Sequence, residues 1–94
     1  MDVFEDQARR IRTEREDLAE RLDEMHGVTP FPTDANFVLA RLPNATRTMR
    51  GLLERRVLVR NLHGAHPLLT NCLRFTVGSP AENQLLLAAL GESL

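Results

Sequence analysis

The stretch that most constrains the fold is residues 72–77, which read CLRFTV. Its alternation predicts a β-strand with Leu73, Phe75 and Val77 on one face. That face has to be covered, because apolar side chains gain free energy when they leave water. The other face carries Arg74 at its centre, together with Cys72 and Thr76. An arginine is seldom buried without a partner, so we expect Arg74 to face either water or an anion.

A long amphipathic helix is predicted over residues 2–26. Asp2 and Glu5 have the spacing of a capping box at its start, and Gly27 ends it. Twenty-five residues make about 37 Å of α-helix, so we expect one end to overhang the sheet or to contact a partner. The apolar stripe recurs at steps of three, four or seven and comprises Phe4, Ala8, Ile11, Leu18, Leu22 and Met25.

Two helices and two strands besides the strand at 72–77 are predicted after the long helix. Residues 27–35 are predicted as a loop containing Pro30 and Pro32, and residues 36–41 as a strand. Asn44 is the expected N-cap of a second helix, in which Met49, Leu52 and Leu53 face inward and Gly51 costs about 1 kcal/mol of helix propensity. Residues 57–60 form a short strand and 61–71 a loop. Ser79, Pro80 and Glu82 mark the start of the last helix, with a capping box.

The order α-β-α-β-β-α predicts an α+β fold, a two-layer sandwich of a small three-stranded mixed sheet with all helices on one face. A right-handed crossover makes the first two strands parallel, and the third returns between them, which gives the order 1-3-2. We expect the helix-covered face to hold Phe37, Leu39, Val57, Val59, Leu73, Phe75 and Val77. The open face would hold Val38, Ala40, Leu58, Arg60, Cys72, Arg74 and Thr76.

Arg74 and Arg60 would lie on an otherwise half-apolar sheet face. They indicate one side of an anion site whose other side is not part of this face. The near-neutral charge of −1 predicts neither nucleic-acid nor membrane-surface binding, and no apolar run is long enough to span a bilayer. A single cysteine cannot form an internal disulfide, so we expect a cytoplasmic location. All twelve basic residues are arginines, so the chain has no lysine amine to offer.

The segments TDANFVLARL, RRVLVRNL and NCLRFTVGSPAENQLLLAAL resemble the C-terminal small domain of histidinol-phosphate aminotransferases. These are fold-type I enzymes that use pyridoxal 5′-phosphate (PLP) and transfer an amino group between histidinol phosphate and 2-oxoglutarate in histidine biosynthesis. The resemblance implies that Arg74 binds a substrate carboxylate and that Arg60 binds the substrate phosphate. It also implies a single domain over 1–94, with a connector-like helix at 1–27 and an α/β sandwich at 28–94. Aromatic-amino-acid aminotransferases and threonine-phosphate decarboxylases share much of the pattern.

The chain departs from the family at Arg56 and Asn71, where glycine is common. Glycine at position 56 would end the second helix in the left-handed region, which arginine enters at a cost of about 1 kcal/mol. Asparagine tolerates that region better. Neither departure involves Arg60 or Arg74, and both concern the geometry of a loop.

Without a lysine the chain alone is expected to be inactive, because a PLP aminotransferase needs that amine. We expect it to hold no catalytic residue, no cofactor and no metal, and to depend on a large PLP-binding domain. His63 and His66 lie in one loop without a nearby cysteine or carboxylate, a poor ligand set. A stand-alone anion-binding or dimerisation module, with self-association of the chain, is the alternative.

Overall fold

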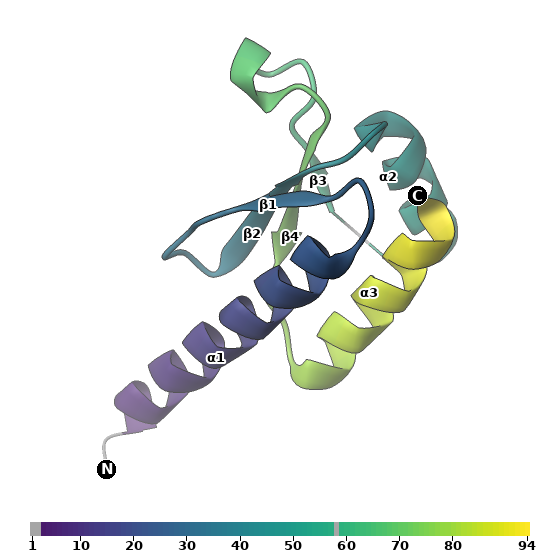
Figure 1. Cartoon of the computed structure of the whole chain (residues 1–94). Coiled ribbons are helices and arrows are strands. Elements are labelled where there is room, and N and C mark those ends of the chain that lie inside the picture. The colour runs from purple at the N-terminus through teal and green to yellow at the C-terminus, as the bar shows by residue number, and fades with distance from the viewer. Residues whose placement is uncertain (1–2, 58) are drawn as a thin grey trace.

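The computed structural model describes residues 3–57 and 59–94 and has the α+β architecture expected from the sequence (Figure 1). The predicted cap at Asp2, the side chain of Phe4 and the predicted strand residue Leu58 lie outside what is described. The elements are α1 (Val3–Glu24), β1 (Thr29–Phe31), β2 (Phe37–Arg41), α2 (Ala45–Glu54), β3 (Arg60–Asn61), a 3-10 turn (Pro67–Leu69), β4 (Cys72–Thr76) and α3 (Pro80–Ser93).

The sheet has four strands in the order β1-β2-β4-β3, and each neighbouring pair is antiparallel. The predicted order of the last three strands is confirmed, and β2 and β3 run in the same direction on either side of β4. The expectation of a three-stranded mixed sheet is wrong on two points, since β1 was taken for a loop and no described pair of strands is parallel. Pro30 is sequence evidence against a strand at β1. An edge strand nevertheless tolerates a residue that has no N–H to donate.

The strand predicted over 57–60 is shorter than expected and shifted, with β3 at Arg60–Asn61. The backbone N–H of Val57 donates to Leu52 O (2.8 Å), which closes the C-terminal end of α2. That N–H is therefore unavailable to a strand ladder. The chain can begin to pair with β4 only after it has left the helix.

The face assignment of β2 from the sequence is also wrong. Phe37 and Leu39 lie opposite Thr76 and Arg74, so they belong to the open face rather than to the covered face. All four residues of FVLA are apolar, so the sequence does not show which alternate residues of the strand face the core. The residues of β2 and β4 that do face the helices are paired as Val38 with Phe75 and Ala40 with Leu73, and all four are fully buried.

All three helices pack on the same face of the sheet, as predicted. Leu18 and Leu22 of α1, Leu52 of α2 and Leu90 of α3 are almost completely buried in one cluster with the core face of the sheet. Leu53, which was expected to face inward, is 46% exposed. It is adjacent to Leu52, and neighbouring positions of a helix point in different directions.

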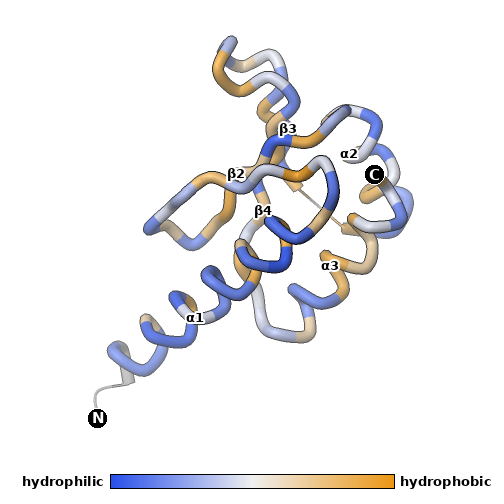
Figure 2. The backbone as a smooth tube through the Cα atoms, in the orientation of Figure 1, coloured by the Kyte–Doolittle hydropathy of each residue, from blue (hydrophilic) through white to orange (hydrophobic). Residues whose placement is uncertain are grey.

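The long helix overhangs the rest of the domain, as its length predicted. Its first turns extend away from the sheet in Figure 1, and Figure 2 shows that this half is mostly hydrophilic. Ile11, which continues the apolar stripe, is 46% exposed, whereas Leu18 and Leu22 further along are buried. Ala8 and Ile11 of the stripe are therefore uncovered within the described chain.

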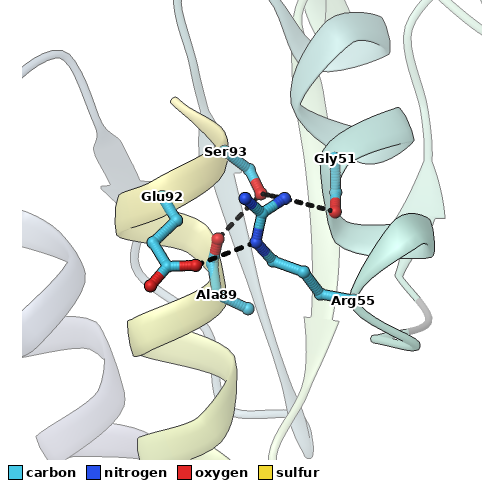
Figure 3. Close-up of polar contacts among 5 residues, drawn as sticks. All are labelled: Gly51, Arg55, Ala89, Glu92 and Ser93. Carbon is cyan, nitrogen blue, oxygen red and sulfur yellow. Dashed lines mark hydrogen bonds and ion pairs between the residues drawn. The ribbon is translucent and has the colours of Figure 1, made fainter.

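Helices α2 and α3 approach closely at Gly51 (Figure 3). A Cβ atom at this position would lie 2.8 Å from Ser93 Oγ, a hydroxyl that itself donates to Ala89 O (2.7 Å). Arg55 spans the contact, donating from Nε to Glu92 (3.0 Å) and from Nη1 to Gly51 O (3.0 Å). The close packing explains why α2 accepts a glycine whose propensity weakens the helix.

The start of α3 has the predicted capping box. The Glu82 N–H donates to Ser79 Oγ (3.2 Å), and the Ser79 N–H donates to the Glu82 carboxylate (3.0 Å). Hydrogen bonds to the carboxylate from the Ser79 backbone N–H and then from the Ser79 side chain lower the pKa of Glu82. The box fixes the turn between β4 and α3, and so fixes where the strand that carries Arg74 ends.

The two positions where the family commonly has glycine both adopt left-handed backbone, with φ of 61° at Arg56 and 57° at Asn71. Asn71 is also tied into the fold, because its Oδ1 accepts from the Ala45 N–H at the start of α2 (3.1 Å). No hydrogen bond of the Arg56 side chain is found within residues 3–57 and 59–94. The two residues share a backbone conformation but differ in what their side chains contribute.

We therefore expect Arg56→Gly to raise the free energy of unfolding by about 0.5–1 kcal/mol, because glycine removes the left-handed strain. Glycine also raises the entropy of the unfolded chain, which cancels part of this stabilisation. Asn71→Gly is the matched control. It should lower stability by about 1 kcal/mol, because the Ala45 N–H loses its acceptor. Urea unfolding followed by circular dichroism measures both. Two variants that shift stability in the same direction would contradict this explanation.

Candidate functional site: an arginine pair on the open sheet face

The two arginines singled out in the sequence lie side by side. Arg60 of β3 and Arg74 of β4 are direct cross-strand partners, so their side chains leave the same, open face of the sheet. A shallow depression of about 390 Å³ includes both arginines in its lining. The other lining residues are Met49, Val59, Asn61 and Thr76.

The pair concentrates positive charge that the rest of the described chain does not neutralise. Like charges directly opposite each other in a sheet repel, so such a pair is retained at a cost in stability. The ion pairs found among the described residues belong to Arg10, Arg21 and Arg55, and none involves Arg60 or Arg74. The arrangement therefore favours binding of an anion from outside.

Arg74 lies over an aromatic ring that was expected on the helix-covered face. Its guanidinium carbon lies over the ring of Phe37, 5.2 Å from the centroid. A contact with a ring face takes up no hydrogen-bond donor, so the N–H groups of Arg74 remain available for bidentate contact with an oxyanion. The signal that would have identified Phe37 is the β2–β4 register, which is not readable from the chain alone.

A third arginine on the same face has a structural role. The guanidinium of Arg41 lies over Phe31, 5.3 Å from the ring centroid. Its Nε donates to Thr70 O (3.1 Å) and its Nη2 to Leu68 O (2.6 Å), which ties down the loop that precedes β4. Since these donors are already used, Arg41 is a poor candidate for ligand binding and serves as an internal comparison for Arg74.

The histidines of the 61–71 loop act as backbone acceptors. His63 Nδ1 accepts from the Asn71 N–H (2.9 Å), and His66 Nδ1 accepts from the Leu68 N–H (3.1 Å). Among residues 3–57 and 59–94, no three histidine, cysteine or acidic side chains are gathered as a metal site would need. The thiol of Cys72 is buried. These residues hold the loop in place beside the arginine pair.

A larger groove, of about 760 Å³, lies elsewhere, between α1 and residues 30–34. Its lining includes the acidic residues Glu16, Glu20, Asp23 and Asp34 and one arginine, Arg15. Arg15 already donates to Ala35 O (3.3 Å). The excess of carboxylates would repel an anionic ligand, so the smaller depression beside Arg74 is the better candidate for the anion site.

Searches with the sequence find close relatives, although no family model matches the chain. It is 53% identical over 89 residues to a histidinol-phosphate aminotransferase of Methylibium petroleiphilum, a match that covers 95% of this chain and 24% of the relative. A histidinol-phosphate aminotransferase of Cupriavidus pinatubonensis is 49% identical over 92 residues, covering 98% of this chain and 25% of that protein. The chain thus spans about a quarter of the length of these relatives.

Solved structures give the same result. The histidinol-phosphate aminotransferase of Clostridium acetobutylicum superimposes with a TM-score of 0.79 at 28% identity, over 87% of this chain and 25% of that one. The L-threonine-O-3-phosphate decarboxylase of Porphyromonas gingivalis gives 0.82 at 29% identity, over 89% and 27%. The Sinorhizobium meliloti histidinol-phosphate aminotransferase, solved in complex with PLP, gives 0.69 at 27% identity, over 89% and 23%.

The residues of this chain do not fit the cofactor of those enzymes, because no lysine is present to bind PLP covalently. What the chain shares with them is a fold and, over nearly its whole length, a substantial part of its sequence. No helix in the described ranges is long and apolar enough to cross a membrane. Over nearly its whole length, this chain is homologous to a segment that makes up about a quarter of a histidinol-phosphate aminotransferase, in agreement with its resemblance to their small C-terminal domain.

Proposed function

We propose that the chain is the substrate-binding domain of a PLP-dependent aminotransferase that acts on histidinol phosphate. This proposal rests on one observation: the guanidinium of Arg74 lies over the ring of Phe37 and has no carboxylate partner in the described chain. Arg60 lies directly beside it on the next strand. A site of this kind recognises small anions by charge-assisted, bidentate hydrogen bonds.

The two arginines suit two different anionic groups. Arg74 binds the carboxylate brought by 2-oxoglutarate or glutamate, because its planar donor fork matches a carboxylate. Arg60, at the exposed edge strand β3, binds the phosphate brought by histidinol phosphate. The relatives' names support a phosphate-bearing substrate, since histidinol phosphate and threonine phosphate are both phosphate esters.

The remaining chemistry comes from a second domain. PLP, held by that domain and its lysine, supplies the electron sink for amino transfer, while the residues of this chain bind and orient the substrate. The large domain would cover the open sheet face and the exposed half of α1, with residues 1–27 as the connector and 28–94 as the sandwich. A cytoplasmic location belongs to this proposal, and the single free thiol of Cys72 is compatible with a reducing compartment.

Two other functions share parts of this evidence. The decarboxylase likeness stands at 29% identity, against 53% for the Methylibium aminotransferase, so the amino-transfer reaction is the better supported. A stand-alone anion-binding module that self-associates would use the same arginines. It would need no second domain, and therefore would not restore amino transfer when joined to one.

We expect 2-oxoglutarate and inorganic phosphate to bind the isolated chain weakly at the arginine pair. Titrations followed through the side-chain Nε–Hε NMR signals should shift Arg74 and Arg60 saturably. Arg50, exposed on α2, is the internal control, because an anion that merely screens charge would shift it equally. Equal shifts at Arg50 and Arg74 would refute a specific site.

The isolated chain should hold no PLP covalently and transfer no amino group, since it has no lysine. Incubation with PLP, dialysis and absorbance spectroscopy test the first statement, and a coupled assay with histidinol phosphate and 2-oxoglutarate tests the second. Colour that survives dialysis together with measurable turnover would show that the chemistry does not depend on another domain.

A further inference from the structure

We propose that Phe37 is a positioning residue for Arg74, holding its guanidinium in place for the incoming carboxylate. This inference rests on the proposed function of Arg74 as an anion-binding residue. It assigns a role to a side chain that acts only through the arginine. The argument comes from the register of the sheet, from the stacking geometry and from the contrast with Arg41.

The register places Phe37 where it can reach Arg74. Leu39 of β2 lies directly opposite Arg74, and Phe37 lies opposite Thr76, so Phe37 is the diagonal neighbour of the arginine on the same face. Diagonal positions are within reach of aromatic and long side chains. The guanidinium carbon of Arg74 lies 5.2 Å from the centroid of the Phe37 ring. Among the described residues, this cation–π contact is the interaction found for the Arg74 guanidinium.

The ring orients the guanidinium without using its donors. Arg41 stacks on Phe31 in the same way, but its Nε and Nη2 are hydrogen-bonded to loop carbonyls. Arg74 also lies over a ring, that of Phe37, but none of its donors is hydrogen-bonded to a carbonyl in the described chain. A side chain held on one face, with its N–H fork free, loses less rotational freedom when a carboxylate arrives, and this preorganisation strengthens binding.

The stack also separates the two cations of the site. β2 and β3 flank β4 on opposite sides, so a guanidinium drawn over Phe37 leans toward β2 and away from Arg60. This lowers the repulsion between the paired arginines and leaves each one free for its own anionic group. Phe37 thus contributes both to the position of Arg74 and to the division of the site into two subsites.

The test uses this chain in four variants, each with a single substitution, and 2-oxoglutarate as the probe. Phe37→Leu removes the ring and keeps an apolar side chain, and Phe37→Tyr restores the ring. Phe31→Leu is the matched control, because it removes the ring under an arginine whose donors are already bound. Arg74→Lys removes the guanidinium itself. If Phe37→Leu does not fold, Phe37→Met replaces it.

The readouts are the ¹⁵N order parameter of Arg74 Nε and the Kd for 2-oxoglutarate. Phe37→Leu should lower the order parameter to that of Arg60 and weaken binding about two- to fivefold, the range of an exposed cation–π contact. Phe37→Tyr should restore both quantities, and Phe31→Leu should change neither. A Phe37→Leu variant that binds like Phe31→Leu overturns the positioning role alone. Unchanged binding in Arg74→Lys, or no saturable binding by the wild type, overturns the proposed function and the positioning role together.

Discussion

Val38→Asp is expected to unfold the chain, whereas Leu39→Asp, one residue along the same strand, is expected to fold. Val38 is fully buried opposite Phe75 on the helix-covered face. An unpaired carboxylate at that position costs about 3–5 kcal/mol, a large part of the stability of a small domain. Urea unfolding followed by circular dichroism measures the loss directly.

Leu39→Asp is the matched control because it places the same carboxylate on the open face, directly opposite Arg74. A half-exposed ion pair of this kind should keep the stability within about 1 kcal/mol of the wild type. It should also abolish binding of 2-oxoglutarate, since the new carboxylate occupies the donors of Arg74. The reverse outcome, with Leu39→Asp unfolded and Val38→Asp intact, would mean that the faces of β2 are those expected from the sequence.

The features that were predicted correctly depend on neighbours in the chain. The capping box of Ser79 and Glu82 and the N-cap Asn44 are set by side chains three residues from their partners. The strand order followed from loop lengths, and the arginine pair followed from that order.

The features that were missed depend on the register between distant strands. β1 exists because residues 29–31 pair with residues 39–41 across a turn, a pairing that two prolines in the sequence disguise. The face of β2 is decided by its alignment with β4, since apolar side chains occupy both parities of β2. Phe37 was therefore assigned to the core, and its contact with Arg74 could not be foreseen.

In a chimera, Arg74→Lys is expected to lower kcat/KM for amino transfer about 30- to 1,000-fold, or about 2–4 kcal/mol of transition-state binding. The chimera replaces the homologous quarter of the Methylibium aminotransferase with this chain, an exchange at 53% identity. Lysine keeps the charge but loses the planar, bidentate fork. Steady-state kinetics with histidinol phosphate and 2-oxoglutarate give the ratio.

Arg50→Lys in the same chimera is the control, since Arg50 is an exposed arginine of α2 outside the lining of the depression. It should leave kcat/KM within a factor of about two, as surface substitutions away from a site usually do. In the isolated chain, Arg74→Lys should change the free energy of unfolding by no more than about 0.5 kcal/mol. A variant that unfolds the isolated chain while the chimera stays fully active would make Arg74 structural.

The central claim is that this chain is the substrate-binding part of such an aminotransferase, and the unmodified chimera tests it most directly. Its kcat/KM for amino transfer from histidinol phosphate to 2-oxoglutarate is the quantity to measure, beside that of the intact Methylibium enzyme. We predict values within about one order of magnitude, because this chain supplies Arg74 and Arg60 for transition-state binding in place of the exchanged segment. A chimera that folds and binds PLP but transfers no amino group would contradict the claim.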